Sequence, residues 1–144
     1  MKSMAKQLVD AGRCGVYQLI GMPEEVERAA KDAGLAAFRI DIGAARDKKD
    51  FLALLAKALR FPNWFGGNWD ALNDSLTDLD WLPATPGYVL VFENSDHFVR
   101  HKRDFDVAKA VLSSAAEYWK TEGRPFWALF EVPQDIKCDL PHWP

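Results

Sequence analysis

A chain of 144 residues, 49% hydrophobic and 12% aromatic, is long and apolar enough to form one domain with its own core. This composition excludes a disordered or fibrous protein, and no run of about 18 apolar residues marks a transmembrane helix. The first fifteen residues lack the apolar stretch of a signal peptide, so we expect a cytoplasmic protein without membrane contact.

The two cysteines, Cys14 and Cys138, lie near opposite ends of the chain and show no CxxC spacing. A disulfide between the two ends stays open, but a reducing compartment favours two buried or unreactive thiols. Two cysteines and three scattered histidines lack the ligand spacing of a zinc site, so we expect no metal or other cofactor.

The net charge of −3 conceals an uneven distribution along the chain. Between Arg60 and Arg100 there is no Lys or Arg, although residues 61–99 hold six acids. The rest of the chain carries 18 bases and 15 acids, so the excess of negative charge lies entirely in this window. Such a window argues against nucleic-acid binding, which needs Lys and Arg, and favours a positively charged partner or a cation.

The chain begins with the patterns of two strands around a helix. Residues 16–20 form a short β-prone run. Pro23 then opens a helical segment that Gly34 closes, which is the usual punctuation of a helix. Residues 35–42 have the pattern of a second strand.

The middle of the chain contains two predicted helices. Asp47 or Asp50 is a suitable N-cap for the first, whose apolar residues between 51 and 59 recur at helical spacing. The sequence FPNWFGGN, residues 61–68, then interrupts the helix with a proline and two glycines. Asn68 is a suitable N-cap for the second helix, which we expect over residues 69–79.

The last third of the chain predicts two more strands around a long helix. Residues 88–93 are an almost uninterrupted apolar run, as in a strand buried on both faces. A helix over about 104–122 and a strand over 125–132 follow, and we expect residues 132–144 to be an irregular tail. The alternation predicts a single α/β domain, residues 1–144, with a small, mostly parallel sheet of about four strands packed by helices.

The helix predicted over 69–79 separates an apolar face from a row of acids. At about 100° per residue, Trp69, Leu72, Leu76 and Leu79 form the core side. Another side carries Asp70, Asp74 and Asp78, with Asn73 beside them. Like charges four residues apart repel each other, and the helix dipole favours only Asp70, so helix stability does not explain the row.

Several uses of the row are open, and a docking face for a basic partner fits best. A solvated polar face normally alternates acids with Lys or Arg, which are missing here. The spacing lacks the glycine turn of a calcium loop, and exposed carboxylates lack the pocket that separates the pKa values of a catalytic pair. Trp64, Phe65 and Trp81 flank the helix and could anchor an interface, although Phe65 and Trp81 could equally fill the core beneath the loop.

Residues 64–77, WFGGNWDALNDSLT, resemble the signature of the barstar family, inhibitors of the ribonuclease barnase. That signature is an aromatic pair, Gly, any residue, Asn, an apolar residue, Asp-Ala-Leu, any residue, Asp, a small residue and Leu. The order of predicted elements over about residues 36–131 is also similar. The resemblance implies a barstar-like fold in which residues 14–34 are an added N-terminal strand and helix.

The resemblance implies a role for the acidic row. In the family this helix and its preceding loop plug an enzyme site that holds RNA phosphate with basic groups, and a carboxylate can replace phosphate there. Asp74 matches the principal phosphate-mimicking aspartate and Asp70 the second carboxylate. Trp64 takes the place of a tyrosine that covers the enzyme's catalytic histidine, and Gly66 and Asn68 match loop positions that touch the enzyme.

The resemblance therefore implies a non-enzymatic inhibitor of immunity or antitoxin type. Its partner would be a basic, barnase-like ribonuclease or a related nuclease toxin, bound one to one by a monomer without direct contact with nucleic acid.

Three positions depart from the family pattern: Asn73 stands where the family has an interface tryptophan, Ser75 where it has a small buried cysteine, and Tyr118 where it has an acid. Trp81 is a candidate to replace the missing tryptophan, and we expect Asn73 and Asp78 at the interface as well.

The alternative function is a small enzyme or a metal-dependent regulator that uses Asp70, Asp74 and Asp78. It needs a converging His, Cys or Lys near the row. His97 and His101, four residues apart, are the only candidates, and such a pair alone is a weak signal.

Overall fold

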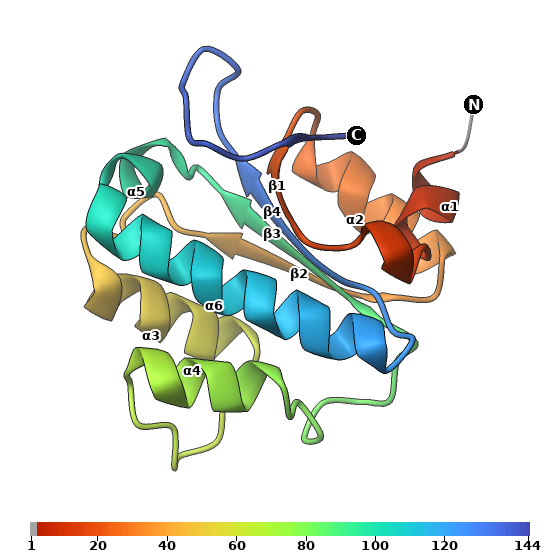
Figure 1. Cartoon of the computed structure of the whole chain (residues 1–144), viewed down its shortest axis with the longest axis horizontal. Coiled ribbons are helices and arrows are strands. Elements are labelled where there is room, and N and C mark those ends of the chain that lie inside the picture. The colour runs from red at the N-terminus through yellow and green to blue at the C-terminus, as the bar shows by residue number, and fades with distance from the viewer. Residues whose placement is uncertain (1–2) are drawn as a thin grey trace.

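The structure is a computed structural model that describes residues 3–144, and it contains a five-stranded sheet with helices on both faces (Figure 1). The strands are β1 (Val16–Leu19), β2 (Ala36–Asp41), β3 (Tyr88–Glu93), β4 (Phe126–Glu131) and β5 (His142–Trp143). Their order across the sheet is β2-β3-β4-β1-β5, and every neighbouring pair is parallel. The predicted α/β fold with a parallel sheet is confirmed, with one strand more than the four expected.

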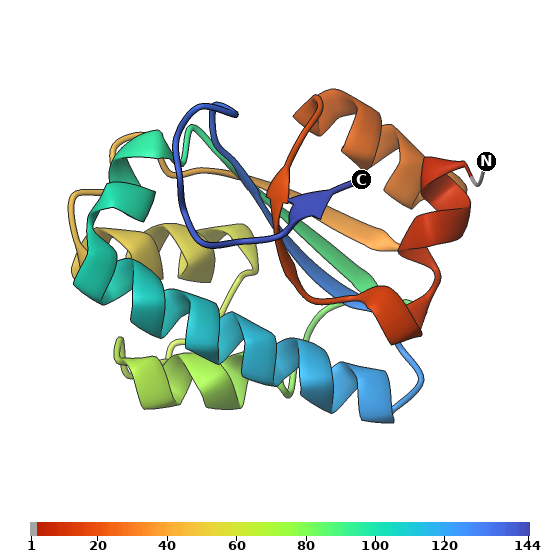
Figure 2. The ribbon, with the colours of Figure 1, turned by 45° about the horizontal axis from the view of Figure 1, so that its top comes forward.

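The described residues also form six α-helices and one 3₁₀ turn, of which the first helix and the turn precede β1. They are α1 (Met4–Leu8), the turn Ala11–Arg13, α2 (Pro23–Asp32), α3 (Lys48–Ala58), α4 (Trp69–Leu76), α5 (Asp96–Arg100) and α6 (Lys102–Thr121). Helices α1 and α2 lie on one side of the sheet, and α3 to α6 lie on the other (Figures 1 and 2). Among residues 3–144, no helix has the length and apolar character to cross a membrane.

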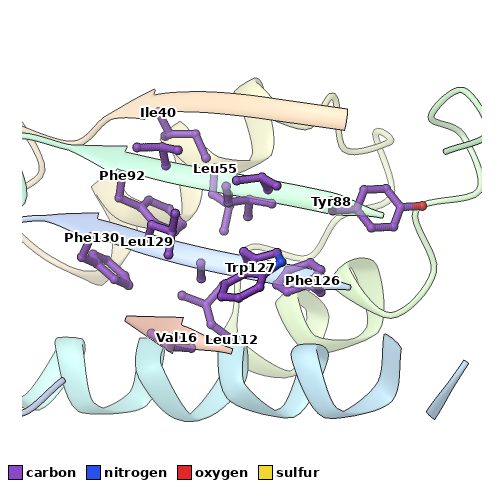
Figure 3. Packing of buried hydrophobic residues seen from close by; sticks show 14 of the residues in the cluster. Val16, Ile40, Leu55, Tyr88, Phe92, Leu112, Phe126, Trp127, Leu129 and Phe130 are labelled. Atoms are coloured by element: carbon purple, nitrogen blue, oxygen red, sulfur yellow. The ribbon is translucent and has the colours of Figure 1, made fainter. Parts of the chain in front are cut away.

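Strands β3 and β4 lie inside the sheet and are its most deeply buried strands. In β3 and β4 the first five residues are all buried, as expected for parallel strands that are covered on both faces. Phe92 and Phe130 stack on neighbouring strands with their ring centroids 4.5 Å apart (Figure 3). Trp127 reaches the other face and donates its indole N–H to the Leu8 carbonyl at 2.8 Å, which ties α1 to the sheet.

The C-terminal segment extends the sheet beyond β1. Most of residues 132–144 are irregular, as expected, but the segment ends in the two-residue strand β5. The amide of Ile20 donates to the Trp143 carbonyl at 2.7 Å, and the Trp143 ring packs 5.4 Å from that of Trp127. Strand β5 and the Trp143 ring thus cover the edge of β1.

Both cysteines are free thiols in buried positions, which confirms the second of the two alternatives. Cys138 donates to the Gln18 side-chain oxygen at 3.2 Å, and Gln18 in turn donates to the Val132 carbonyl at 3.2 Å. Burial is the main cause that raises the pKa of both the Cys14 and the Cys138 thiols, so both favour the neutral, unreactive form.

Candidate protein-binding site

The loop before α4 is built by the residues that the sequence analysis singled out. Helix α3 ends at Ala58, and Arg60 takes a left-handed backbone with φ of 53°. Gly67 has φ of 67°, a conformation that favours glycine. Asn68 then caps α4, since its side-chain oxygen accepts from the Ala71 amide at 2.7 Å. The predicted N-cap is therefore confirmed.

The apolar side of α4 fixes the helix on its neighbours. Leu72 and Leu76 are fully buried, and Trp119 of α6 donates its indole N–H to the Leu76 carbonyl at 2.8 Å. Ser75 is also fully buried, and its hydroxyl has no hydrogen-bond partner within the described residues. Because this side faces α6 and the core, the opposite side of α4 faces solvent.

That outer side carries Asp70 and Asp74, both exposed. Within residues 3–144, neither carboxylate forms an ion pair. Helix α6 shows the usual alternative, since its Asp106 pairs with Lys102 at 3.1 Å and Lys109 at 3.5 Å. Residues 61–99 contain no Lys or Arg, and no base from elsewhere in the described chain lies within ion-pair distance of the Asp70 and Asp74 carboxylates. We call Asp70 and Asp74 the acidic face of α4.

The expectation that the helix continues to residue 79 was wrong. Helix α4 ends at Leu76, because the Thr77 hydroxyl donates to the Asn73 carbonyl at 2.9 Å and Leu79 takes a left-handed backbone with φ of 56°. Asp78 therefore lies in the turn after α4 and is not the third member of a helical row.

A second acid joins Asp78 in this turn. The Asp80 amide donates to the Asp78 carboxylate at 3.3 Å. A shared hydrogen bond and the repulsion between the two carboxyl groups raise the pKa of Asp80 above its ordinary value. Asp80 was not among the predicted site residues, although its place in a window without bases was a usable signal.

Four aromatic rings stand in a chain beside the acidic face. Trp64 is 61% exposed and meets Trp81 edge-on with centroids 5.9 Å apart. Trp81 is half-buried, donates its indole N–H to the Leu59 carbonyl at 2.9 Å, and packs edge-on against Phe61. Phe65 is half-buried against Phe61 at 4.8 Å. Trp81 thus supports Trp64 from beneath the loop.

The other predicted contact residues, Gly66 and Asn73, belong to the loop before α4 and to α4 itself. Gly66 is exposed, and a Cβ there would only reach ordinary contact with Asn68 and Ala71 at 3.5 and 3.6 Å. Asn73 is half-buried one residue before Asp74. Tyr118 of α6, which was not a predicted contact but stands where the family has an acid, is 42% exposed and adjoins Trp119, near the C-terminal end of α4. The loop, α4 and the following turn thus bring the predicted residues to one region.

The two histidines of the alternative reading do not share a continuous helix. His97 belongs to α5, whereas His101 lies between α5 and α6 with ψ of 70°, outside the helical range. The His101 ring nitrogen lies 3.5 Å from an Asp104 carboxylate oxygen. In the part of the chain that the structure describes, no three His, Cys, Asp or Glu side chains are placed to hold a metal ion.

The sequence profile of the family described as Barstar (barnase inhibitor) matches residues 35–131. This segment runs from the residue before β2 to the end of β4 and contains the loop and α4, whereas α1, β1, α2 and β5 lie outside it. A comparison with curated proteins gave no match. Because the profile covers more than half of the chain and the parallel α/β fold agrees with it, the protein belongs to the barstar family, whose members inhibit barnase-type ribonucleases and are not enzymes themselves.

Proposed function

We propose that this chain inhibits a basic, barnase-type ribonuclease by placing α4 and its preceding loop in the enzyme's phosphate-binding site. The observation that carries the proposal is the acidic face, two exposed carboxylates on one helix without an ion-pairing cation among residues 3–144. The family match supports the class of partner.

The two carboxylates of the acidic face are available to accept hydrogen bonds from the enzyme. Asp74 takes the position of the RNA phosphate and accepts charge-assisted hydrogen bonds from the enzyme's Arg, Lys or His groups. Asp70, one helical turn earlier, receives a second basic group. Because neither carboxylate is ion-paired within the described chain, binding breaks no internal salt bridge, and the new interaction is opposed mainly by the cost of removing water from the charged groups.

Trp64 supplies the apolar contact beside the acids. Its ring is exposed but already held edge-on by Trp81, so little side-chain freedom is lost when a partner covers it. We assign it the position over the catalytic histidine of the enzyme. Asn68 uses its side-chain oxygen for the helix cap, which leaves its amide nitrogen for the partner, and Gly66 offers backbone without a side chain in the way.

The turn after α4 contributes at longer range. Asp78 and Asp80 add negative charge next to the contact surface, and such charge accelerates the encounter with a basic enzyme. We propose a cytoplasmic monomer that binds one enzyme molecule, acts without catalysis and makes no direct contact with RNA. A related nuclease toxin with a basic active site fits the same chemistry.

An inhibition titration tests the proposal. We expect stoichiometric inhibition of a barnase-type ribonuclease by the natural chain. The variants Asp74→Ala and Asp70→Ala should each weaken binding by about 2–5 kcal/mol, because each leaves buried basic groups of the enzyme unpaired; the barnase–barstar pair is itself a reference system for such effects. Asp32→Ala, an exposed acid at the end of α2 on the opposite side of the sheet, is the matched control and should change nothing.

Two results would contradict the proposal. Full affinity in both α4 variants, with the natural chain inhibiting, would place the binding surface elsewhere. Failure of the natural chain to inhibit any barnase-type ribonuclease or nuclease toxin with a basic site would reject the function. Urea unfolding of each variant separates a lost contact from a lost fold.

A further inference from the structure

Strand β2 forms one edge of the sheet, and within residues 3–144 no strand pairs with its outer side. The amides of Ala36 and Ile42 donate inward, to the carbonyls of Gly87 and Glu93. Because backbone groups alternate in direction along a strand, those of Ala37, Arg39 and Asp41 point outward. Exposed strand edges of this kind are templates for another extended chain.

The two faces beside this edge differ in chemistry. On the α2 side, Arg39 is surrounded by carboxylates of Glu24 at 3.0 Å, Glu27 at 3.6 Å and Glu93 at 2.7 Å. The Glu24 side chain is still 50% exposed. The Lys31 ammonium also lies 4.0 Å from Glu27, so three carboxylates and two cations leave one net negative charge next to the edge.

The opposite face of the same edge is apolar. Phe38 alternates with Arg39, so it lies on the α3 side, where it is half-buried. A shallow hollow opens beside it, lined by Phe38, Leu82, Pro83 and Ala84, with Arg60 and Thr85 as its polar side chains. The edge is thus flanked by carboxylates on one side and by mainly apolar surface on the other.

We propose that the β2 edge binds an extended peptide segment in which basic and apolar residues alternate, so that the segment adds a sixth strand to the sheet. Its backbone would pair with Ala37, Arg39 and Asp41. Its basic side chains would lie toward Glu24 and Glu27, and its apolar ones toward the hollow at Leu82. A second copy of this chain is a poorer occupant, because pairing β2 with itself brings both sets of carboxylates together. The proposal does not rest on the ribonuclease inhibition.

A blocked hexapeptide of alternating Lys and Val is the probe. We expect it to shift the backbone NMR resonances of Ala37, Arg39 and Asp41 and to slow the hydrogen exchange of their amides. A peptide of the same sequence with N-methyl groups on alternate backbone nitrogens should not bind, because it cannot complete the ladder. A peptide with Glu in place of Lys should not bind either, because it meets the carboxylates of α2.

Variants of the protein test the same contacts. Ala37→Pro removes an outward donor without touching the β2–β3 ladder and should abolish binding, whereas Ala37→Thr keeps the donor and should bind normally. Glu24→Gln combined with Glu27→Gln should weaken the Lys-Val peptide about fivefold, as expected for exposed charge pairs.

Two outcomes overturn the proposal. Resonance shifts confined to α4 would mean that the peptide recognises only the acidic face through its charge. Equal binding of the N-methylated peptide would exclude strand pairing, even if Ala37→Pro failed to fold.

Discussion

Carboxylates cluster in two regions of this molecule. In one region they are ion-paired, and in the other they form no ion pair within residues 3–144. Around Arg39, the groups of Glu24, Glu27 and Glu93 share one guanidinium at 2.7 to 3.6 Å. On α4 and in the turn after it, four aspartates stand without an ion pair among the described residues: Asp70, Asp74, Asp78 and Asp80.

The carboxylates around Arg39 stabilise the fold through ion pairs, whereas the aspartates of α4 and the following turn are available to bind a partner. The hydrogen bonds to Glu93 are the main cause that raises the pKa of Arg39 above its already high ordinary value. The guanidinium therefore stays charged and joins α2 to β2 and β3. The aspartates of α4 join nothing, and their mutual repulsion slightly destabilises the chain. In the proposed function, the missing cation comes from the ribonuclease.

The largest effect on stability is expected from a variant that breaks the ion pairs around Arg39. Arg39→Met leaves three carboxylates without their cation and should lower the free energy of unfolding by about 1–3 kcal/mol, because the Arg39–Glu93 pair is bidentate and mostly buried. Urea unfolding at neutral pH measures the loss. Arg46→Met is the control, since the Arg46 side chain is 81% exposed and pairs only with Asp50; it should change little. Equal losses in the two variants would mean that the Arg39 network is no stronger than a surface pair.

The buried side of α4 extends the comparison to uncharged groups. Ser75→Ala removes a buried hydroxyl that has no partner and should raise the free energy of unfolding by about 1 kcal/mol. Ser95→Ala is the matched change, because the buried Ser95 hydroxyl donates to the Phe92 carbonyl at 2.7 Å, and it should lower stability by about 1 kcal/mol. The urea midpoints of the two variants should therefore move in opposite directions; a loss in both would show that Ser75 does have a stabilising partner.

A cation introduced on α4 should stabilise the helix and weaken its proposed binding to the ribonuclease. Asn73→Lys places an ammonium three residues after Asp70 and near the helix C-terminus, which stabilises the helix by about 0.3–0.5 kcal/mol. The same change should weaken ribonuclease inhibition, because the new cation competes with the enzyme for the acidic face. Thermal unfolding and the inhibition titration test the two halves, and Asn73→Gln controls for the change of side chain. Unchanged inhibition would argue against a contact at this face.

The smallest expected effect depends on pH. Asp80 has its pKa raised above the ordinary 3.8 by Asp78, so its ionised form destabilises the fold, and this penalty disappears as the pH falls through the raised value. Asp78→Asn should therefore move the urea midpoint upward at pH 7 and leave it unchanged near pH 3. The same shift at both pH values would show that the effect does not come from charge.

The sequence predicted those elements whose pattern is long and self-contained. The run YVLVFE gave the limits of β3 correctly, because a strand buried on both faces needs only apolar side chains. Asn68 predicted its helix start because capping is a local interaction. The short elements α1, α5 and β5 were missed, since they are too short to show a period and depend on tertiary contacts such as that of Trp143 with Trp127.

The site was predictable in composition but not in geometry. A window without bases indicated exposed carboxylates, and Asp70 and Asp74 are exposed. The position of Asp78 depended on where α4 ends, and that end is set by the Thr77 hydroxyl and by the left-handed backbone of the buried Leu79, neither of which leaves a pattern in the sequence. The support of Trp64 by Trp81 likewise required coordinates, because it depends on a hydrogen bond to Leu59.

The exposure of Trp64 gives the protein an optical reporter. Of its six tryptophans, three are buried and two are half-buried, whereas Trp64 alone among them is exposed, at 61%. Emission on the red side of the spectrum therefore comes mainly from this ring, and iodide in solution should quench it before the others. Any molecule that covers the loop before α4 shifts that emission to shorter wavelength, while a ligand at the β2 edge leaves it in place. The unlabelled protein can thus distinguish the two surfaces by its own fluorescence.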